Sequence, residues 1–172
     1  MGHANQIVMD VDSSDVVRSF NKFGRMMPEE MREGLLEWMN LIGLTSVAKY
    51  MQYRKVVDAA TGRVEGRRSP SDKLGIVTSR LSRSILNQTS SFGNEAIRRA
   101  VVTGDDVYGE IGSKTPYAAI HEYGGRAGKG GASHIPARAY LNPAVDDTQT
   151  AGFAILKAKL ELTVRRAESG GL

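Results

Sequence analysis

Apolar residues repeat at helical spacing over two long stretches of the chain, one near each end. In the first stretch they are Val16, Phe20, Phe23, Met27, Met31, Leu35, Trp38 and Ile42. Residues three or four positions apart lie on one face of a helix, so this spacing predicts a long helix that begins after Asp12 or Ser13. Pro28, with two acidic residues after it, has the composition of a fresh helix start. We therefore expect a kinked or two-part helix.

The second stretch of helical spacing lies at the other end of the chain. Its apolar residues are Val145, Phe153, Leu156, Leu160 and Val164. Asn142 is a favourable N-cap and Pro143 suits the first helical position, which predicts a helix from Pro143 to Arg166. We expect the apolar residues to form its buried stripe.

Strand signals lie mainly between the two long helices. Residues 97–103 and 107–112 are β-prone runs joined by Gly104-Asp105-Asp106, which is a strong hairpin signal. We also predict an edge strand over 6–11 and an extended run over about 135–140. A short helix over 78–87 is expected to turn two residues, Leu81 and Ile85, toward the core.

Together these elements predict one α+β domain over residues 1–172. In it, a small, mostly antiparallel sheet is packed by the long N-terminal and C-terminal helices. The open edges of such a sheet invite pairing with a neighbouring copy. The chain has 172 residues, of which 41% are hydrophobic and 24% charged, and this is ordinary for a folded protein.

Composition also narrows the compartment and the chemistry. The chain contains no cysteine, which excludes disulfides and thiolate metal ligands and fits a reducing cytoplasm. No apolar run approaches the roughly 20 residues of a membrane span. The opening residues MGHANQ lack the features of a secretion signal. We therefore expect neither secretion nor a membrane partner.

Positive charge is concentrated in an insertion over residues 54–72, which lacks helical periodicity and contains turn residues. Residues 54–83 carry eight basic and three acidic side chains, a net charge of +5, whereas the whole chain carries +4. We interpret the insertion as a basic loop or hairpin. Arg63, Arg67 and Arg68 are candidate contacts for DNA or an acidic partner. A solvated loop is the alternative, since no aromatic residues stand between the arginines to stack bases.

A second unusual segment, residues 124–132, is rich in glycine. Pro116 can open a short helical turn with Tyr117, Ile120 and His121 on one face, and Gly124-Gly125 ends that turn. Seven of the nine residues in 124–132 are glycine or alanine, which gain little from packing. We predict that this glycine loop is mobile in the isolated chain and becomes ordered against a neighbouring protein.

Motifs that resemble enzyme or metal sites are incomplete in this chain. Gly128-Lys129 lacks the Ser or Thr that follows the lysine of a phosphate loop. His121-Glu122 begins like a zinc-protease helix, but Gly125 occupies the position of the second histidine. We predict no catalytic, cofactor or metal site. We expect His121 to be structural, with a ring nitrogen bonded to backbone near the glycine loop.

Two segments resemble a known family, the phage tail-completion or virion morphogenesis proteins. The first is Tyr117-Ala-Ala-Ile-His-Glu-Tyr-Gly-Gly125, followed by a glycine-rich spacer and by Ile135-Pro-Ala-Arg138, with an aromatic residue and Leu141 before the last helix. The second, Thr78–Ile85, is similar to the family's threonine, glycine, leucine, basic, serine, isoleucine segment, with Ser79 where glycine is usual. Counting the order of elements, the resemblance runs from about Met9 to Arg166.

The resemblance implies a structural virion protein of the phage neck or tail end, without enzymatic activity or cofactor. Such a protein forms a ring, a hexamer by likeness to the family, that completes the tail and joins it to the head. The implied partners are other copies, the tail tube, the head-tail connector and packaged DNA in the lumen, after assembly in the host cytoplasm. The implied interface residues are Tyr117, His121, Glu122, Tyr123, Gly124, Gly125, Ile135, Pro136, Arg138 and Leu141.

Two other functions remain open on the residues alone. A basic nucleic-acid-binding module is suggested by the pI of about 9.4 and by the arginines of the insertion. An enzyme is the weakest alternative, because His121 and Glu122 alone hint at acid-base chemistry.

Arg138 is the one charged residue in the apolar run 135–141, and it lies just before a predicted helix N-terminus. Positive charge is unfavourable there, so we expect a compensating carboxylate. Glu122 is the predicted partner, in a bidentate pair that closes the base of the glycine loop.

Overall fold

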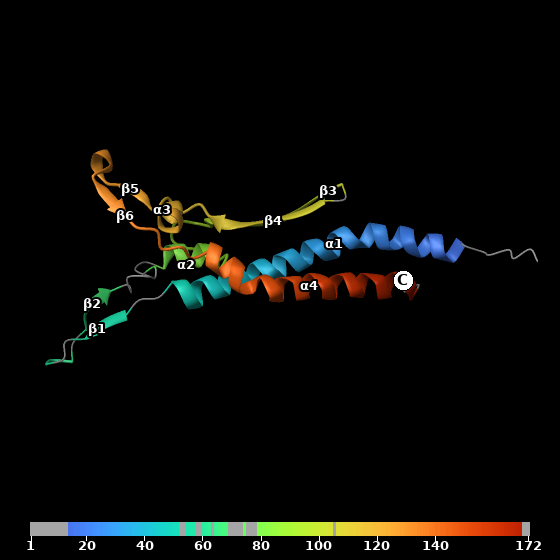
Figure 1. Ribbon diagram of the computed structural model, residues 1–172, viewed down its shortest axis with the longest axis horizontal. Coiled ribbons are helices and arrows are strands. Elements are labelled where there is room, and N and C mark those ends of the chain that lie inside the picture. The colour runs from blue at the N-terminus through green and yellow to red at the C-terminus, as the bar shows by residue number, and fades with distance from the viewer. Residues whose placement is uncertain are drawn as a thin grey trace, which may run out of the picture.

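The computed structural model describes residues 14–51, 54–57, 60–62, 64–68, 74, 79–104 and 106–169. Its frame is a pair of long antiparallel helices, α1 (Ser14–Thr45) and α4 (Asn142–Glu168), which pack along each other (Figure 1). A π-helical turn, η1 (Ser46–Tyr50), extends α1. The helix predicted over 143–166 is therefore confirmed, whereas the strand predicted over 6–11 lies outside the described residues.

Three antiparallel hairpins and two short helices complete the described fold, which confirms the predicted α+β class. The strands pair as β1 (Arg54–Val57) with β2 (Val64–Arg68), β3 (Ala96–Thr103) with β4 (Asp106–Ser113), and β5 (Gly125–Ala127) with β6 (Ser133–Ile135). The short helices are α2 (Arg80–Ile85) and α3 (Ala118–Tyr123), and a 3-10 turn, η2 (Lys129–Gly131), connects β5 to β6. The hairpins are separate two-stranded sheets. The extended run predicted over 135–140 is strand only at Ile135.

Helix α1 passes through Pro28 without ending, so of the two predicted forms, kinked or two-part, the two-part helix is wrong. Proline removes one backbone hydrogen bond from a helix interior. Here α4 holds α1 on both sides of that point. Arg166 of α4 accepts a hydrogen bond of 3.0 Å from Lys22 through its carbonyl oxygen and pairs with Glu30 through its guanidinium. Contacts to a second helix thus offset the local cost of the proline.

The buried part of the face that α4 turns toward α1 is made of small residues, and most of the predicted apolar stripe lies elsewhere. The buried residues of α4 are Ala144, Thr148, Gly152, Thr163 and Ala167. The prediction is wrong for Phe153, Leu160 and Val164, which are 57%, 41% and 38% exposed. Leu156, by contrast, packs beside Gly34 of α1, and Val145 is half-buried. Small side chains allow two helix backbones to approach closely.

Trp38 of α1 decides which residues of α4 can face it. A Cβ atom added to Gly152 would lie 2.1 Å from the Trp38 indole, so the ring rests directly on the α4 backbone. The indole N–H donates to the Thr148 hydroxyl oxygen over 3.1 Å. The Phe153 ring flanks it with a centroid distance of 5.8 Å. A bulky aromatic side chain in α1 therefore requires a glycine in α4.

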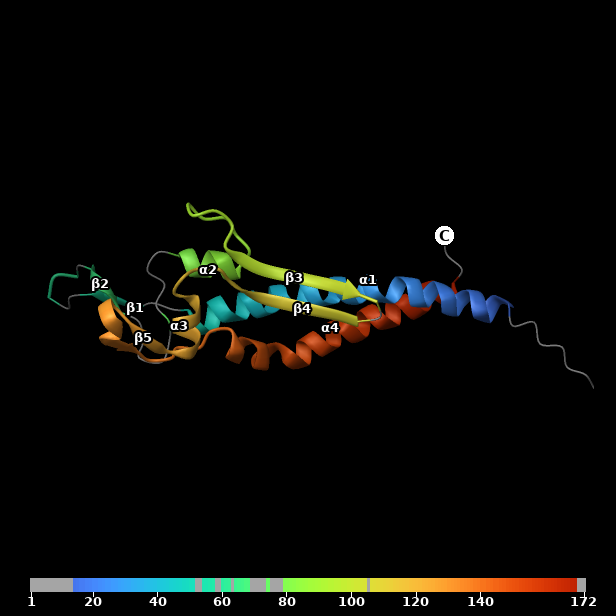
Figure 2. The same ribbon diagram turned by 90° about the horizontal axis from the view of Figure 1, so that it is seen from above.

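The β3–β4 hairpin, predicted from its turn residues, is confirmed with Thr103 paired to Asp106. It lies along α1, and α4 lies on a different side of the same helix (Figures 1 and 2). Gly109 faces α1, because an added Cβ would meet the Met39 side chain at 3.3 Å. Arg98 reaches from the same hairpin face to Asn40 and to the Ile85 carbonyl oxygen.

A hydrophobic cluster joins α2 and α3 at the end of the molecule where α4 begins. Its buried residues are Met51, Leu74, Leu81, Ile85, Ala118 and Tyr140. Leu81 and Ile85 are the two residues of the short helix that were predicted to point inward, and both are confirmed as buried. The cluster thereby docks α2 and α3 against the start of α4.

The residue before α2 explains one feature of the sequence. Ser79 has φ 58° and ψ 2°, the left-handed conformation that glycine adopts without strain. It occupies the position where the resembling segment usually has glycine. Its side chain makes no capping hydrogen bond. The backbone therefore keeps a glycine conformation with a serine in place.

We predict that Gly152→Ala destabilises the protein, because the new methyl group would overlap the Trp38 ring. Overpacking of this kind costs about 1–3 kcal/mol, although alanine has the better helix propensity by about 1 kcal/mol. Urea unfolding measures the difference. Gly24→Ala is the matched control, since an added Cβ there meets nothing within 4 Å and should stabilise α1. Equal gains in both variants would contradict the close contact.

We predict that Ser79→Gly stabilises the protein by about 0.5–1 kcal/mol. Relief of the left-handed strain exceeds the extra entropy of glycine in the unfolded chain. Thermal unfolding provides the measurement. The exposed Ser91, which is not in the left-handed region, is the control, and Ser91→Gly should not raise the stability. A loss of stability in Ser79→Gly would show that the serine side chain has another role.

Candidate functional site

One buried carboxylate, that of Glu122 in α3, joins the Tyr117–Gly125 part of the resemblance to the residues that open α4. This side chain is 6% exposed. One oxygen accepts the backbone N–H groups of Tyr140 and Leu141 over 2.8 and 3.0 Å, and the other accepts that of Asn142 over 2.8 Å. Charge-assisted hydrogen bonds of this number compensate a carboxylate for the loss of water.

These hydrogen bonds also cap α4. The first N–H groups of a helix have no partner within it, and the positive end of the helix dipole attracts an anion. Asn142 was predicted as the N-cap, but α4 begins at Asn142 and no side chain at its start makes a capping hydrogen bond. Glu122 performs that role from a different helix.

Further contacts tie α3 to the segment that precedes α4. The Arg138 N–H donates to the His121 carbonyl oxygen over 2.7 Å, and the Tyr140 hydroxyl donates to the Ala118 carbonyl oxygen over 3.4 Å. Burial, and then the Glu122 charge, raise the pKa of Tyr140 above its ordinary range, so its hydroxyl remains a neutral donor. The corner is thus held mainly through the backbone, which fixes its geometry closely.

Gly124 allows the close approach at the base of this corner. Its φ is 72°, and an added Cβ would lie 2.8 Å from the Ala137 nitrogen and 3.1 Å from the Ile135 carbonyl oxygen. The predicted end of the helical turn at Gly124 is confirmed, because α3 ends at Tyr123. No side chain fits at this position without a shift of the backbone.

The glycine loop predicted over 124–132 has more regular structure than expected. Gly125 pairs with Ile135 and Ala127 with Ser133, so β5 and β6 form a short hairpin above the corner. The 3-10 turn Lys129–Gly131 makes its tip. Its mobility in the isolated chain, and its ordering against a neighbour, remain predictions.

The predicted ion pair between Arg138 and Glu122 is wrong. Both Glu122 oxygens are occupied by backbone N–H groups, and the buried Nε of Arg138 has no hydrogen-bond partner among the described residues. The two segments that this pair was expected to connect are nonetheless connected. Hydrogen bonds from the backbone at the start of α4 to Glu122 connect them instead of Arg138. A helix N-terminus competes successfully for the carboxylate because it offers three N–H groups at once.

The predicted hydrogen bond from His121 to backbone is also wrong for Nδ1, which is buried without a partner among the described residues. The ring instead meets Tyr117 edge-on, with a centroid distance of 5.7 Å. Burial, and then the charge of Arg138, lower the pKa of His121 below its ordinary value. The imidazole is therefore neutral at pH 7.

The structure brings the ten predicted interface residues into this one corner, although it buries most of them at least in part. Glu122 is buried, Tyr123 and Pro136 are exposed, and the rest are half-buried. The half-buried residues are Tyr117, His121, Gly124, Gly125, Ile135, Arg138 and Leu141. Tyr123, which is 73% exposed, offers the largest apolar surface of the set to a partner.

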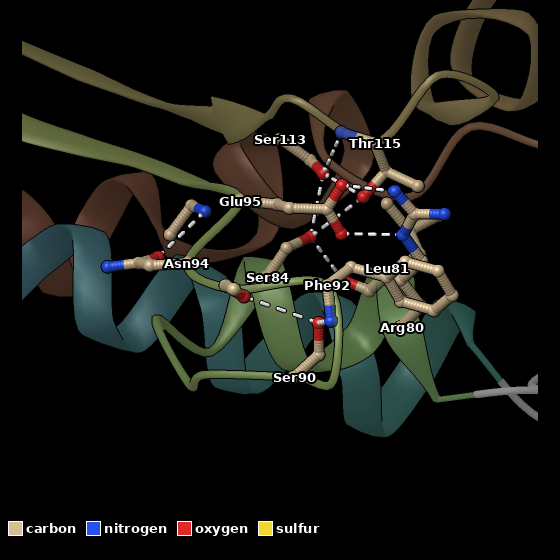
Figure 3. A network of polar contacts seen from close by, with 11 residues as sticks. Arg80, Leu81, Ser84, Ser90, Phe92, Asn94, Glu95, Ser113 and Thr115 are labelled. Carbon is tan, nitrogen blue, oxygen red and sulfur yellow. Dashed lines mark hydrogen bonds and ion pairs between the residues drawn. The ribbon is translucent and has the colours of Figure 1, made fainter.

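Sequence reasoning missed a polar network that connects α2 to the base of the β3–β4 hairpin (Figure 3). The Ser84 and Ser113 hydroxyls share a hydrogen bond of 2.7 Å, and Ser113 also donates to the Thr115 hydroxyl over 2.7 Å. The single hydroxyl proton of Ser84 is shared between the Ser113 oxygen and the Leu81 carbonyl oxygen. Ser84 belongs to the Thr78–Ile85 segment of the resemblance. Its hydrogen bonds at this junction give a structural reason for the serine in that segment.

Arg80 lies at the edge of the same network and pairs with Glu95 through two hydrogen bonds (Figure 3). Its guanidinium also stacks on the Phe92 ring, 3.8 Å from the centroid. The hydrogen bonds from Arg80 lower the pKa of Glu95 below its ordinary value. Arg80 therefore adds little free positive charge to the basic patch in which the sequence placed it.

The basic insertion forms the predicted hairpin, β1 with β2. Arg63 lies outside the described residues, whereas Arg67 and Arg68 belong to β2. The backbone register sets Arg54 opposite Arg68 and Lys55 opposite Arg67. Like charges directly opposite each other destabilise a two-stranded sheet. The pairing of β1 with β2 therefore gives no structural reason for the many basic residues of this hairpin.

Searches of the described residues for two other kinds of site were negative. No group of three or more His, Asp or Glu side chains there could hold a metal ion. No helix within the described ranges is long and apolar enough to cross a membrane.

We predict that Glu122→Gln destabilises the protein by about 1–3 kcal/mol, because an amide has one acceptor oxygen where three N–H groups need partners. Chemical unfolding is the measurement. Glu37→Gln is the control, since Glu37 is exposed on α1 and lies 3.9 Å from Lys159, a pair worth less than about 1 kcal/mol. Similar small losses in the two variants would contradict the capping role of Glu122.

Comparisons with known proteins identify the family. The model of the phage virion morphogenesis family matches residues 58–161, more than half of the chain, from the basic hairpin through most of α4. This range includes both segments that carry the resemblance and the corner around Glu122. No curated protein and no solved structure gives a significant match. The chain belongs to the phage virion morphogenesis family, and it is a virion-associated protein with a structural or assembly role.

Proposed function

We propose that the chain is a structural protein of the phage neck or tail end, and that copies of it form a ring that completes the tail and joins it to the head. The family match over residues 58–161 carries this proposal. A repeated contact between two different surfaces of one chain closes into such a ring when its rotation allows. The ring is assembled in the host cytoplasm and remains at the neck or tail of the virion.

Apolar surface on the single chain supports assembly. The large apolar side chains that are exposed are Leu44, Phe92, Tyr108, Tyr123, Phe153, Leu160, Leu162 and Val164. Half of them belong to α4. Scattered apolar residues are normal on a protein surface, but several on one helix indicate a surface that a partner covers.

The proposed role needs no catalysis. Glu122 is buried, and its two oxygens accept three backbone N–H groups at the start of α4, a structural use of the carboxylate. His121 contacts Tyr117 and lies beside the positive charge of Arg138. Neither arrangement pairs an acid with a base over a reacting group. The two residues that hinted at an enzyme are therefore assigned to the rigid corner.

We predict that the protein forms a hexamer of about 112 kDa, six times the 18.7 kDa of one chain. Light scattering on the purified protein and reconstruction of the virion neck are the two measurements. A closed ring in either setting supports the proposal. A monomer in both would refute it.

A second candidate function is binding to DNA phosphates through the β1–β2 hairpin, and its backbone register favours it. Facing basic residues, with Arg54 opposite Arg68 and Lys55 opposite Arg67, concentrate charge in a short hairpin. The hairpin extends away from the two long helices (Figure 2). Phosphate groups would relieve the repulsion between the facing residues. In a neck ring, the ligand would be the DNA that passes through the lumen.

We predict that replacing Arg67 and Arg68 with serine weakens binding to duplex DNA and reduces the slope of log K against log salt by about 2. Fluorescence anisotropy at several salt concentrations measures both quantities. Replacement of Arg25 and Lys129, two exposed basic residues outside the hairpin, is the control for the loss of charge. An identical reduction in the control would argue for non-specific attraction by net charge alone.

A further inference from the structure

Helix α4 carries a strip of exposed apolar residues that its own chain leaves uncovered. Phe153, Leu160 and Val164 are spaced by seven and four residues, which places them along one line of the helix, and they are 57%, 41% and 38% exposed. We call these three residues the α4 strip. The face of α4 that packs on α1 is centred on other residues, such as Gly152 under Trp38, and the Phe153 ring lies at its edge, 5.8 Å from the Trp38 ring centroid.

A second uncovered apolar surface lies on the β3–β4 hairpin. Gly109 and Arg98 face α1, so the residues that alternate with them point to the other side of the two-stranded sheet. The apolar residues on that side are Ile97, Val101 and Tyr108, which we call the outer hairpin face. Tyr108 is 51% exposed. Ile97 and Val101 are half-buried, and the main contacts of the hairpin among the described residues are with α1 and α2.

We infer that the α4 strip of one copy docks on the outer hairpin face of a second copy, and that this contact repeats around the ring. The inference rests on the ring of the proposed function and adds the two surfaces that join its subunits. A sheet with one open face is stabilised by a helix that lies across it. Each of the two surfaces, the α4 strip and the outer hairpin face, is thus covered by another copy of this chain.

The outer hairpin face has apolar residues at its two ends and an ion pair between them. Ile97 and Val101 lie four residues apart on β3, about 14 Å along the strand. Between them, Arg99 bonds to Glu110 of β4 through a salt bridge of 2.7 Å. Both charged side chains are largely exposed, so they are accessible to a second copy.

The α4 strip also has apolar residues at its two ends and charged residues between them, and the distance between its ends is similar. Phe153 and Val164 lie eleven residues apart, about 16 Å along the helix axis. Lys157 and Glu161 lie between them and approach each other to 4.0 Å.

On both surfaces charged residues lie between apolar end residues, with Leu160 between Lys157 and Glu161 on α4, so the apolar ends can meet while the ion pairs face each other. Lys157 can then pair with Glu110 of the second copy, and Glu161 with Arg99 of that copy. These ion pairs favour this register of the contact over registers in which only the apolar residues meet.

The arrangement of the layers suits a contact that repeats. The hairpin and α4 lie on different sides of α1 (Figure 1). A contact that uses one of these surfaces from each copy leaves the other surface free for the next copy. This is a heterologous contact, the kind that builds a ring and not a closed dimer.

The absence of native cysteine allows a direct test by site-specific cross-linking. Tyr108→Cys and Leu160→Cys place one thiol on each surface, and a short bismaleimide reports their proximity. We expect each single variant to remain uncross-linked, an equimolar mixture of the two to give one dimer band, and the double variant to give a ladder of multimers. Leu44→Cys, on an exposed apolar residue of α1, replaces Tyr108→Cys in the control mixture and should give no dimer.

The outcomes separate this contact from the ring itself. Dimers of Leu160→Cys alone would show that α4 pairs with α4, and would overturn the inference. A wild-type ring in light scattering, without any ladder from the double variant, would overturn the inference and leave the proposed ring standing. A wild-type monomer, both in solution and in the virion neck, would refute the ring and this contact together.

Discussion

The cap that Glu122 places on α4 is the interaction on which the arrangement of the rest depends. A buried carboxylate is costly unless it is fully bonded, and the first N–H groups of a long helix are costly unless they are capped. The N–H groups provide hydrogen bonds for the carboxylate, and the carboxylate caps the helix. The position at which α4 begins is thereby fixed relative to α3, and α4 then runs along α1 with Gly152 under Trp38.

From this fixed start the molecule divides into a rigid frame and the surfaces that the frame presents. The corner around Glu122 and the cluster that contains Tyr140 hold the short helices and the beginning of α4 together. The β5–β6 hairpin, the basic hairpin and the exposed residues of α4 project from that frame. A virion component must keep its shape while it binds neighbours, and this division of roles suits that requirement.

Local sequence patterns predicted the features that depend on near neighbours. The β3–β4 hairpin followed from its turn residues, and the inward positions of Leu81 and Ile85 followed from helical spacing. Gly124 ended α3 as expected, since a left-handed residue at a helix end depends on a few adjacent peptides. The family resemblance came from two motifs in order along the chain, without any knowledge of their contacts.

The sequence by itself determined the α+β class, the two long helices and most of the turns, because these depend on contacts only a few residues long. The tertiary structure alone decided the partner of Glu122, which lies 18 to 20 residues away across a hairpin of variable geometry. It also decided which face of α4 is buried. Periodicity selects the largest apolar residues, whereas the position of Gly152 against the Trp38 ring admits no side chain, and that contact exists only after both helices are in place.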